Sequence, residues 1–410
     1  MKKLKVGVFG AGRGWDLALN FMAFDCDIVA LCDTRKEKLE KYAPLLSKGG
    51  RVYEDFDQFI QHDMDAIILA NDFHQHAPYA IRCMKKGIHV YSECISNGTM
   101  AEGVALIRAA EESNAVYMLA ENYPQMLFNR EIARICKGGT LGKILYAEGE
   151  YNHPTARADA DFIKITRFHR EHWRAYLPAT YYITHSLGPI MCATGATPRR
   201  VTAFAIFAPN RVGLYNGDNS AIITTQNDDG SVYRMVGCAH FGAHHNSYRV
   251  CGENGQVENL RGMGDRIMLR YNSWSCPEGA STTSLYEPVF NDLGANYNPL
   301  IGHGGADYLT VRNFLRCIEE GCQPEHPFNV HSAVAMSSVA ILGHRSMLEG
   351  GIPYDIPDFR QEEWRKKYEN DTLSPFPGED GSAPTLPCCS HPDYRPSDAE
   401  MEEYDSIIRS

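Results

Sequence analysis

The segment Lys5-Val-Gly-Val-Phe9-Gly10-Ala-Gly12-Arg13-Gly14 decides the fold of this chain. Its short apolar run is typical of a buried strand, and it leads directly into closely spaced glycines and the start of a helix. This order of elements lets the backbone approach a pyrophosphate while the helix N-terminus points at its negative charge. The third glycine of the usual fingerprint would fall at Trp15, and here it is Gly14.

An acidic residue strengthens the interpretation of this turn as a dinucleotide site. Asp33 ends the next predicted strand, Ile28–Cys32, about 20 residues after the glycines, where the fingerprint places an acid on the ribose hydroxyls. A glycine turn can be purely structural, but this sequence of strand, glycines, helix, strand and acid favours nucleotide binding. A carboxylate repels a 2′-phosphate, so we predict NAD; Arg35 lies close by and keeps NADP as the alternative.

The pattern of apolar runs divides the chain into two regions. In the first 120 residues strands alternate with helices such as Ala101–Glu112, which indicates βαβ units and a parallel sheet. After about Pro124 the strands are separated by turns such as Asp229–Gly230 and Asn254–Gly255, which suit antiparallel hairpins. The predicted strands of this second region are 143–151, 201–207, 221–225, 232–239, 248–251, 257–260 and 267–271, and its predicted helices are 131–136, 306–319 and 332–348.

The predicted fold is α/β, with an N-terminal Rossmann parallel sheet and a C-terminal α+β domain built on a large, mostly antiparallel open sheet. We expect an NAD-binding domain over residues 1–123 and a substrate and oligomerisation domain over residues 124–369. Residues 370–410 are rich in Pro, Gly, Ser and Asp, and we predict an irregular tail there. The active site is expected in a cleft at the carboxyl ends of the parallel strands.

The composition of the 410 residues is that of a globular protein with a large core, since 44% are hydrophobic and 22% charged. The 51 acidic residues outnumber the 40 basic ones, which argues against a nucleic acid or an anionic membrane as partner. No apolar run is long enough to cross a bilayer, and no signal peptide is recognisable. The 13 cysteines are therefore predicted to be reduced thiols of a cytoplasmic protein.

Clustered histidines and cysteines raise the question of a metal site. His240, His244 and His245 lie close together in the sequence, but no carboxylate or cysteine stands at a recognised ligand spacing from them. The pair Cys388–Cys389 has no such partner either. We therefore predict no metal.

The motifs of the first region resemble those of the Gfo/Idh/MocA oxidoreductase family, and the resemblance extends over roughly residues 4–365. They are the glycine turn, the segment 70–77 and the segment 86–93. Members usually have Glu-Lys-Pro after this last strand, and the lysine acts in dehydrogenation of a sugar hydroxyl. Here the triplet is Glu93-Cys94-Ile95, so the lysine is absent and Cys94 is either a small packing residue or a reactive thiol. The resemblance implies NAD as the cofactor, held by Gly10, Gly12, Arg13, Gly14, Asp33, Asn71, Phe73, His76, Glu93, Asn122 and Trp173.

The motifs of the second region resemble one branch of that family, the NAD-dependent α-N-acetylgalactosaminidases, which also lack the lysine. They are the segments 148–153, 172–174, 181–189, 302–305 and 357–359. In that branch the Tyr-x-Thr-His segment, here Tyr182–His185, lies against the sugar and the nicotinamide. The resemblance implies a homo-oligomer through the second sheet, because an exposed apolar sheet face would be a liability. It also implies catalytic roles for His185, Tyr182 and Tyr151, and substrate-binding roles for Arg174, His153, Thr184, Tyr248 and His303.

Each of these residues also has a structural interpretation. His185 can act as general acid or base because imidazole titrates near neutrality, but it can equally be a buried histidine held by one backbone bond. Tyr151 and Tyr182 can serve the site or simply pack. His153 alternates with Tyr151 along a strand, so both point to one face, as a structural pair would too. His303 can touch substrate or cap the next helix.

The sequence thus predicts an NAD-dependent enzyme acting on a sugar or glycoside, most simply a redox-assisted glycosidase. In that chemistry the sugar is transiently oxidised at C3, the acidified C2 proton is removed, the aglycone is eliminated, water adds and the sugar is re-reduced. The alternatives are a sugar, inositol or glycoside dehydrogenase that releases NADH, and a non-catalytic dinucleotide-binding sensor. The identity of the sugar and its anomeric configuration stay open.

Overall fold

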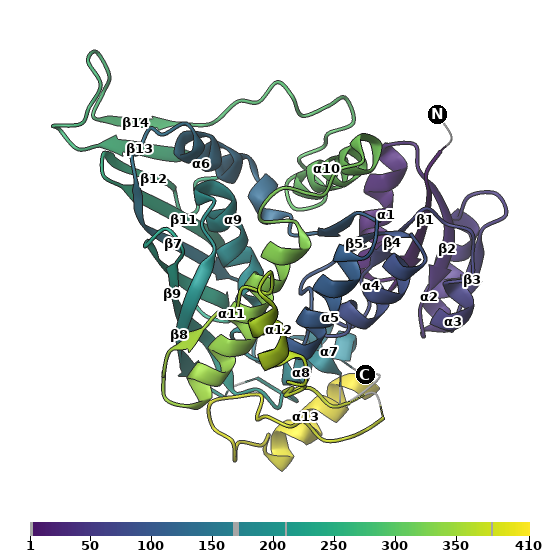
Figure 1. The fold of residues 1–410 in the computed structure, drawn as a ribbon. Helices are drawn as coiled ribbons and strands as arrows, with labels where there is room; N and C mark the ends of the chain where they lie inside the picture. The colour runs from purple at the N-terminus through teal and green to yellow at the C-terminus, as the bar shows by residue number, and fades with distance from the viewer. Residues whose placement is uncertain (1–2, 167–171, 210, 379) are drawn as a thin grey trace. The chain divides into compact units, whose positions relative to one another are not determined.

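The computed structural model of the chain describes residues 3–166, 172–209, 211–378 and 380–410 (Figure 1). It divides into two compact units whose segments interleave along the sequence. The first unit consists of Met1–Glu131, Pro288–Val334 and Phe359–Asn370, and the second of Ile132–Glu287, Ala335–Asp358 and Asp371–Ser410. The chain thus returns twice to the first unit, whereas the boundaries predicted at residues 123 and 369 describe continuous segments and remain a prediction.

A six-stranded parallel sheet forms the core of the first unit, in the order β3-β2-β1-β4-β5-β6. Its strands are β1 Lys5–Phe9, β2 Asp27–Cys32, β3 Arg51–Tyr53, β4 Ala66–Leu69, β5 His89–Ser92 and β6 Tyr117–Leu119. The central strands are almost wholly apolar and buried, as expected when helices cover both faces. The strand order reverses between β1 and β4, and the crevice at this point is where such sheets bind nucleotides.

The helices of the first unit come from all three of its sequence segments. They are α1 Arg13–Ala23, α2 Lys36–Tyr42, α3 Phe56–Phe59, α4 His76–Lys85, α5 Met100–Glu111, α10 Ala306–Glu320 and α12 Glu362–Tyr368, with the short 3-10 helices Ala43–Leu45 and Tyr123–Gln125. Helix α10 packs against α1, where Phe314 contacts Phe21. Two further helices, α6 Leu127–Lys137 and α11 Val330–Leu348, run across the limits between the units.

A nine-stranded sheet dominates the second unit, in the order β14-β13-β12-β11-β7-β10-β9-β8-β15. Its strands are β7 Ile144–Asn152, β8 Pro198–Phe207, β9 Asp218–Asn227, β10 Val232–Ala239, β11 His245–Gly252, β12 Gly255–Asn259, β13 Ile267–Tyr271, β14 Thr283–Tyr286 and β15 Tyr354–Asp355. Every neighbouring pair is antiparallel except β7 and β10, which run parallel. The fold class predicted from the sequence, a Rossmann sheet plus a mostly antiparallel sheet, is therefore confirmed.

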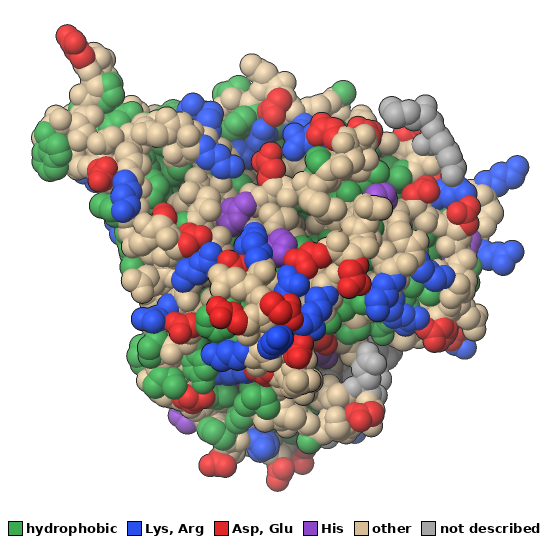
Figure 2. Space-filling view, viewed as in Figure 1, with side chains coloured by type: hydrophobic (Ala, Val, Ile, Leu, Met, Phe, Trp, Pro, Cys, Tyr) green, Lys and Arg blue, Asp and Glu red, His purple; other side chains and the backbone are tan. Residues whose placement is uncertain are grey.

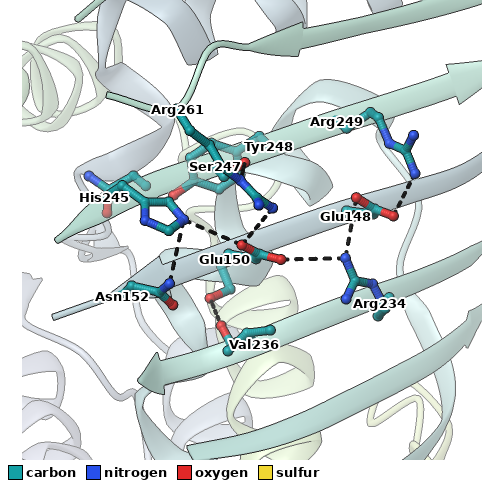
Figure 3. A network of polar contacts seen from close by, with 12 residues as sticks. Glu148, Glu150, Asn152, Arg234, Val236, His245, Ser247, Tyr248, Arg249 and Arg261 are labelled. Atoms are coloured by element: carbon teal, nitrogen blue, oxygen red, sulfur yellow. Dashed lines mark hydrogen bonds and ion pairs between the residues drawn. The ribbon is translucent and has the colours of Figure 1, made fainter. Parts of the chain in front are cut away.

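Strand β7 separates two environments because its side chains alternate between the faces of the sheet. Gly149 lies under α9 (Thr184–Thr194), so closely that a Cβ atom there would be 2.1 Å from the carbonyl oxygen of Ser186. Glu148 points to the other face, where Arg249 donates to it at 2.6 Å and Arg234 lies 3.3 Å away (Figure 3). One face is thus covered by a helix, and the other carries a network of ion pairs.

The C-terminal segment is more regular than the sequence analysis expected. Residues Asp398–Arg409 form helix α13, which begins with a reciprocal capping box between Ser397 and Glu400. Tyr404 is buried against Ile163 and Val212. The helix is stabilised by this small apolar cluster, whose members are far apart in the sequence, and composition alone did not reveal it.

Charged side chains of both signs are interspersed over the face drawn in Figure 2. Exposed pairs such as Arg108–Glu362, with 2.9 Å between nitrogen and oxygen, are typical of such a surface. Each contributes at most about 1 kcal/mol to stability. Within the described residues, no helix combines the length and the apolar composition that a bilayer span requires.

Candidate functional site

The glycine turn after β1 has the geometry of a pyrophosphate-binding loop. Gly10 has a φ of 93°, and a Cβ atom there would lie 2.1 Å from the carbonyl oxygen of Ala70, so only glycine lets the turn approach the end of β4. A Cβ at Gly12 would meet nothing closer than Arg35 Nη2 at 3.7 Å, which leaves its backbone open. Gly14 packs closely against Val8: a Cβ atom at Gly14 would lie 2.8 Å from Val8 Cγ1, too close for any larger residue. Gly14 therefore takes the close-packing role of the missing third glycine.

Asp33 lies at the end of β2 and faces the glycine turn. Its Oδ2 accepts a hydrogen bond from the Ala11 amide at 2.7 Å, and Arg35 donates to both of its oxygens at 3.0 Å. Burial on its own would raise the pKa of Asp33, but the hydrogen bonds from Arg35 and Ala11 outweigh it and lower that pKa below the ordinary value. A fixed carboxylate thus stands where the ribose acceptor was predicted.

Three predicted residues of the first unit converge on one carboxylate that the sequence analysis did not single out, Asp307 of α10. Arg13 binds it through two hydrogen bonds of 2.7 Å, Asn122 donates to it at 2.6 Å, and His303 Nδ1 lies 3.3 Å away. The same guanidinium donates to Glu93 at 2.9 Å.

Asp307 is only 1% exposed, so its charge depends on these partners. Burial would raise the pKa of Asp307, but His303 and Arg13 hold it well below its ordinary value. His303 adopts a φ of 55° in the glycine run before α10, in the left-handed region that few non-glycine residues occupy. The structure thus brings His303 beside Tyr123 and Asp307 in the first unit.

The remaining predicted cofactor residues of the first unit line the ends of β4 and β5. The buried side-chain amide of Asn71 has no hydrogen-bond partner among the described residues, next to the close approach of Gly10 to β4. Buried polar groups are normally paired, so this amide fits a ligand seated at the turn, as NAD would be. Phe73 is buried, and the Nδ1 of His76 contacts the carbonyl oxygen of Ile95 at 2.8 Å while burial lowers the pKa of its imidazole.

Cys94, the second residue of the triplet Glu93-Cys94-Ile95, is a buried thiol. Its Sγ donates to Glu121 Oε2 at 3.2 Å, and only 5% of the residue is exposed. A lysine ammonium at this position would have to be desolvated beside that carboxylate. The thiol fills the space without bringing a cation.

The three predicted catalytic residues meet in the second unit and form an aromatic group. The His185 ring lies edge-on to Tyr151 and to Tyr182, with 5.1 Å between centroids in both cases, and the two tyrosine rings lie 6.0 Å apart. Tyr182 has non-helical backbone angles within the 3-10 helix Tyr181–Ile183, which directly precedes α9. Tyr248 donates its hydroxyl to the His185 carbonyl oxygen at 2.5 Å and so supports the first turn of α9.

Two further residues of the second unit extend this group. The Oγ1 of Thr184 is buried with no hydrogen-bond partner among the described residues, so it can bind a ligand hydroxyl. His153, which directly follows β7, stacks on Tyr151 at 5.7 Å, and its Nδ1 lies 3.1 Å from the Nδ1 of His244. The hydroxyl of Tyr248 donates to the backbone, and its role in substrate binding remains a prediction.

Trp173 and Arg174 begin the short helix α8 Trp173–Tyr176, also in the second unit. The Arg174 guanidinium lies over the Trp173 ring at 4.4 Å, and the His172 ring stacks on the same indole at 5.4 Å. Arg211, which no motif marks in the sequence, lies over Phe162 at 4.6 Å.

Among the residues that the structure describes, no three histidines, cysteines or acids are arranged to hold a metal ion.

Comparison with known proteins identifies both regions. Residues 4–121 match the oxidoreductase family with an NAD-binding Rossmann fold, and residues 210–366 match the C-terminal domain of glycosyl hydrolase 109. The family resemblance and the NAD-binding Rossmann domain predicted from the sequence are therefore confirmed. The two matches lie in the order in which the predicted domains follow each other.

Whole-chain relatives agree with these matches. A glycosyl hydrolase family 109 protein of Streptomyces niveus is 26% identical over 94% of this chain and 81% of its own length. One of Solibacter usitatus is 25% identical over 89% of this chain and 90% of its own length. The solved structure of levoglucosan dehydrogenase in complex with NADH and levoglucosan covers 87% of this chain and 100% of its own, with a TM-score of 0.72 and 18% identity. At that identity the likeness shows a shared fold.

Proposed function

Because this chain belongs to the Gfo/Idh/MocA oxidoreductase family through residues 4–121 and to glycosyl hydrolase family 109 through residues 210–366, we propose that it is an NAD-dependent, redox-assisted glycosidase. The observation that carries the proposal is the group of Tyr151, Tyr182 and His185, whose rings lie within 6.0 Å of one another. Such a group can move protons at a sugar ring. The buried thiol of Cys94, in place of the lysine that is usual in the wider Gfo/Idh/MocA family, supports chemistry other than plain dehydrogenation.

The proposed reaction proceeds by elimination. Bound NAD supplies reversible oxidation at a sugar carbon, C3 in this proposal, which acidifies the neighbouring C2–H. His185, or a tyrosine of its group, then removes the C2 proton, and the bond from C1 to the aglycone oxygen breaks. The aglycone oxygen takes up a proton as it leaves, and water adds to the resulting double bond, with its oxygen at C1 and a proton at C2. Return of the hydride to C3 then restores the hydroxyl, so that the net reaction is hydrolysis without net NADH. Arg174 and Thr184 are proposed to hold the sugar, since Thr184 Oγ1 lacks a partner among the described residues.

A sugar, inositol or glycoside dehydrogenase that stops at the ketone and releases NADH is the second candidate. The oxidoreductase-family match of residues 4–121 favours it. A non-catalytic sensor is the third, and the intact aromatic group around His185 argues against it.

Absorbance of NADH during turnover separates the three. The test incubates the NAD-loaded enzyme with a panel of nitrophenyl glycosides and records aglycone and NADH together. The proposal predicts aglycone release without net NADH. Stoichiometric NADH without aglycone would establish the dehydrogenase instead, and a protein that binds NAD but yields neither product would be the sensor.

The variant Cys94→Lys introduces the lysine that the wider Gfo/Idh/MocA family uses for dehydrogenation. We expect no gain in sugar-dependent NADH production, because the new ammonium must be desolvated next to Glu121. Steady-state NADH formation by the variant and the wild type measures this. A clear rise in the variant would mean that the ancestral proton relay is still in use.

We also propose that NAD is preferred over NADP, that the protein forms a homo-oligomer and that it is cytoplasmic. Register pairing puts the exposed Phe204 and Leu285 on the same face of the sheet as Glu148, which supports an interface there. Light scattering tests this interface: the molecular mass of the Phe204→Glu assembly is expected to be smaller than that of the wild type.

All 13 cysteines are free thiols, which supports a reducing compartment.

A further inference from the structure

The second unit carries two arginines and three histidines beside the aromatic group, here termed the cationic cluster because its two guanidiniums are positively charged: Arg174, Arg211, His153, His240 and His244. Its histidines lie at the same end of three neighbouring strands of the nine-stranded sheet. His153 follows β7, His240 follows β10 and His244 directly precedes β11. The hydrogen bond of 2.9 Å from the His153 amide to the Ala239 carbonyl joins two of these strand ends. Residues far apart in sequence thus meet at one place.

The charges of the cluster act on one another. Burial lowers the pKa of His153, and His244, Arg174, His185 and Arg211 lower it further. Burial also lowers the pKa of Arg211 to about 10, and the repulsion from Arg174 adds to this effect. A negative charge among these groups would favour the charged forms of the histidines and reduce the repulsion between the two guanidiniums.

No carboxylate among the described residues forms an ion pair with Arg174 or Arg211, and each guanidinium lies over an aromatic ring instead. Asp159 is the acid whose charge reaches Arg211, and its carboxylate already accepts a hydrogen bond from the Phe162 amide at 2.7 Å. This is unusual in a chain with a net charge of −11, in which acids of both units are paired with arginines.

We propose that the cationic cluster binds a negatively charged group on the sugar, so that the substrate is an acidic glycoside; this inference rests on the proposed function. A guanidinium matches the geometry of a carboxylate or a sulfate, with two parallel hydrogen bonds. A partly buried cation without such a partner is destabilising, and an anionic ligand removes that cost. A carboxylate of a uronic acid and a sulfate ester offer the same chemistry.

The position of His153 connects the cluster with the reacting atoms. One face of its ring stacks on Tyr151, which contacts His185, and its Nδ1 faces His244. The anion would therefore lie within about one sugar ring of the carbon that His185 deprotonates, which suits a substituent of the same sugar.

Turnover of matched glycosides gives the first test. Nitrophenyl glycosides of a neutral sugar, of the corresponding uronic acid and of a sulfated sugar are compared with the wild type, Arg211→Gln, Arg211→Lys and the surface control Arg200→Gln. We expect kcat/KM of the wild type to favour one of the acidic substrates by about tenfold to a hundredfold, the range of a hydrogen bond to a charged group. Arg211→Gln should abolish this preference, Arg211→Lys should retain part of it and Arg200→Gln should leave it unchanged. The acidic substrate that is preferred identifies the anion.

Binding gives a second test that does not depend on turnover. Calorimetry on the NAD-loaded enzyme compares glucuronate with glucose, and sulfated glucose with glucose. Tighter binding of an acidic sugar, weakened by Arg211→Gln and by salt, supports the inference even if no glycoside is cleaved. Equal or tighter binding of glucose would overturn it. A loss of NAD affinity in Arg211→Gln with unchanged sugar binding would also overturn it and would assign the cluster to the cofactor.

Discussion

Charged side chains have different partners in the two groups of predicted site residues. Around the glycine turn the acids are paired with arginines, as in Asp33 with Arg35 and Asp307 with Arg13. In the second unit Arg174 and Arg211 lie over aromatic rings instead. The first arrangement holds its geometry without a ligand. On the proposal made above, the second is completed electrostatically when an anion binds, so the proposed cofactor residues are preorganised and the proposed substrate residues respond to their ligand.

The largest effect should come from His185→Ala, which removes the proposed acid–base group and leaves the cofactor residues intact. Turnover should fall at least about a hundredfold, because general acid–base groups contribute 10²–10⁴-fold. NAD affinity should stay nearly constant, since the glycine turn and Asp33 belong to the first unit. Steady-state kinetics and calorimetry measure the two quantities. A variant within a few-fold of the wild type would make His185 a structural histidine.

Arg13→Met tests whether the pairing in the first unit matters. It leaves Asp307 and Glu93 without their cation, and breaking a buried pair on one side costs about 3–5 kcal/mol. Denaturant unfolding should report a loss of stability of this size, and NAD binding should weaken. The double variant Arg13→Met/Asp307→Leu should recover part of the stability. Single and double variants of equal stability would show that the ion pair is not the cause.

Asp33→Ala sharpens the comparison at the ribose position. The variant removes the acceptor that Ala11 and Arg35 hold in place, so NAD affinity should fall by about tenfold to a hundredfold. The freed Arg35 should improve NADP binding at the same time. Calorimetry with both cofactors measures this. If the wild type binds NADP as tightly as NAD, the assignment of Asp33 as a selective acceptor is wrong.

The smallest effect concerns His344, a buried imidazole of the second unit that has no acidic partner among the described residues. Burial lowers its pKa to about 4 even though the Pro387 carbonyl, 2.7 Å from Nε2, works in the other direction. Below the unfolded pKa of about 6.5 the unfolded state therefore binds more protons, and stability falls as pH falls toward 4. At pH 5 this single group removes about 2 kcal/mol.

The measurement is the free energy of unfolding at pH 7.5 and at pH 5, for the wild type and for His344→Gln. The variant should lose less stability between these values than the wild type does, by about the 2 kcal/mol of the one histidine. Identical pH dependence of the two proteins would mean that His344 is protonated in the folded state.

Local signals made most of the fold predictable. Strand β1 has the predicted limits Lys5–Phe9 and β10 the predicted limits Val232–Ala239, because apolar runs bounded by glycine turns are visible in the sequence. The exposed edge strands β3 and β14 lack such a signal and were not predicted. The capped helix α13 was not predicted either, since its buried partners lie elsewhere in the chain.

The residues of the candidate site also fall into those that a local sequence signal marked and those that it did not. Tyr151 and His153 were placed on one face by the period of a strand, and the motif around His185 marked its neighbours. Asp307 was not found, because its partner Arg13 is 294 residues away. Arg211 was not found either, since no motif and no spacing marks it. Contacts between distant segments can only be seen in the folded chain.

The most direct test of the elimination chemistry is the reaction in D₂O, followed by mass spectrometry and proton NMR of the released sugar. Removal of the C2 proton and addition of solvent predict one deuterium at C2 of the product, with aglycone released and no net NADH. The same experiment on His185→Ala should lose deuterium incorporation together with turnover. Released sugar without deuterium at C2, formed at the full rate by the wild type, would contradict the elimination mechanism.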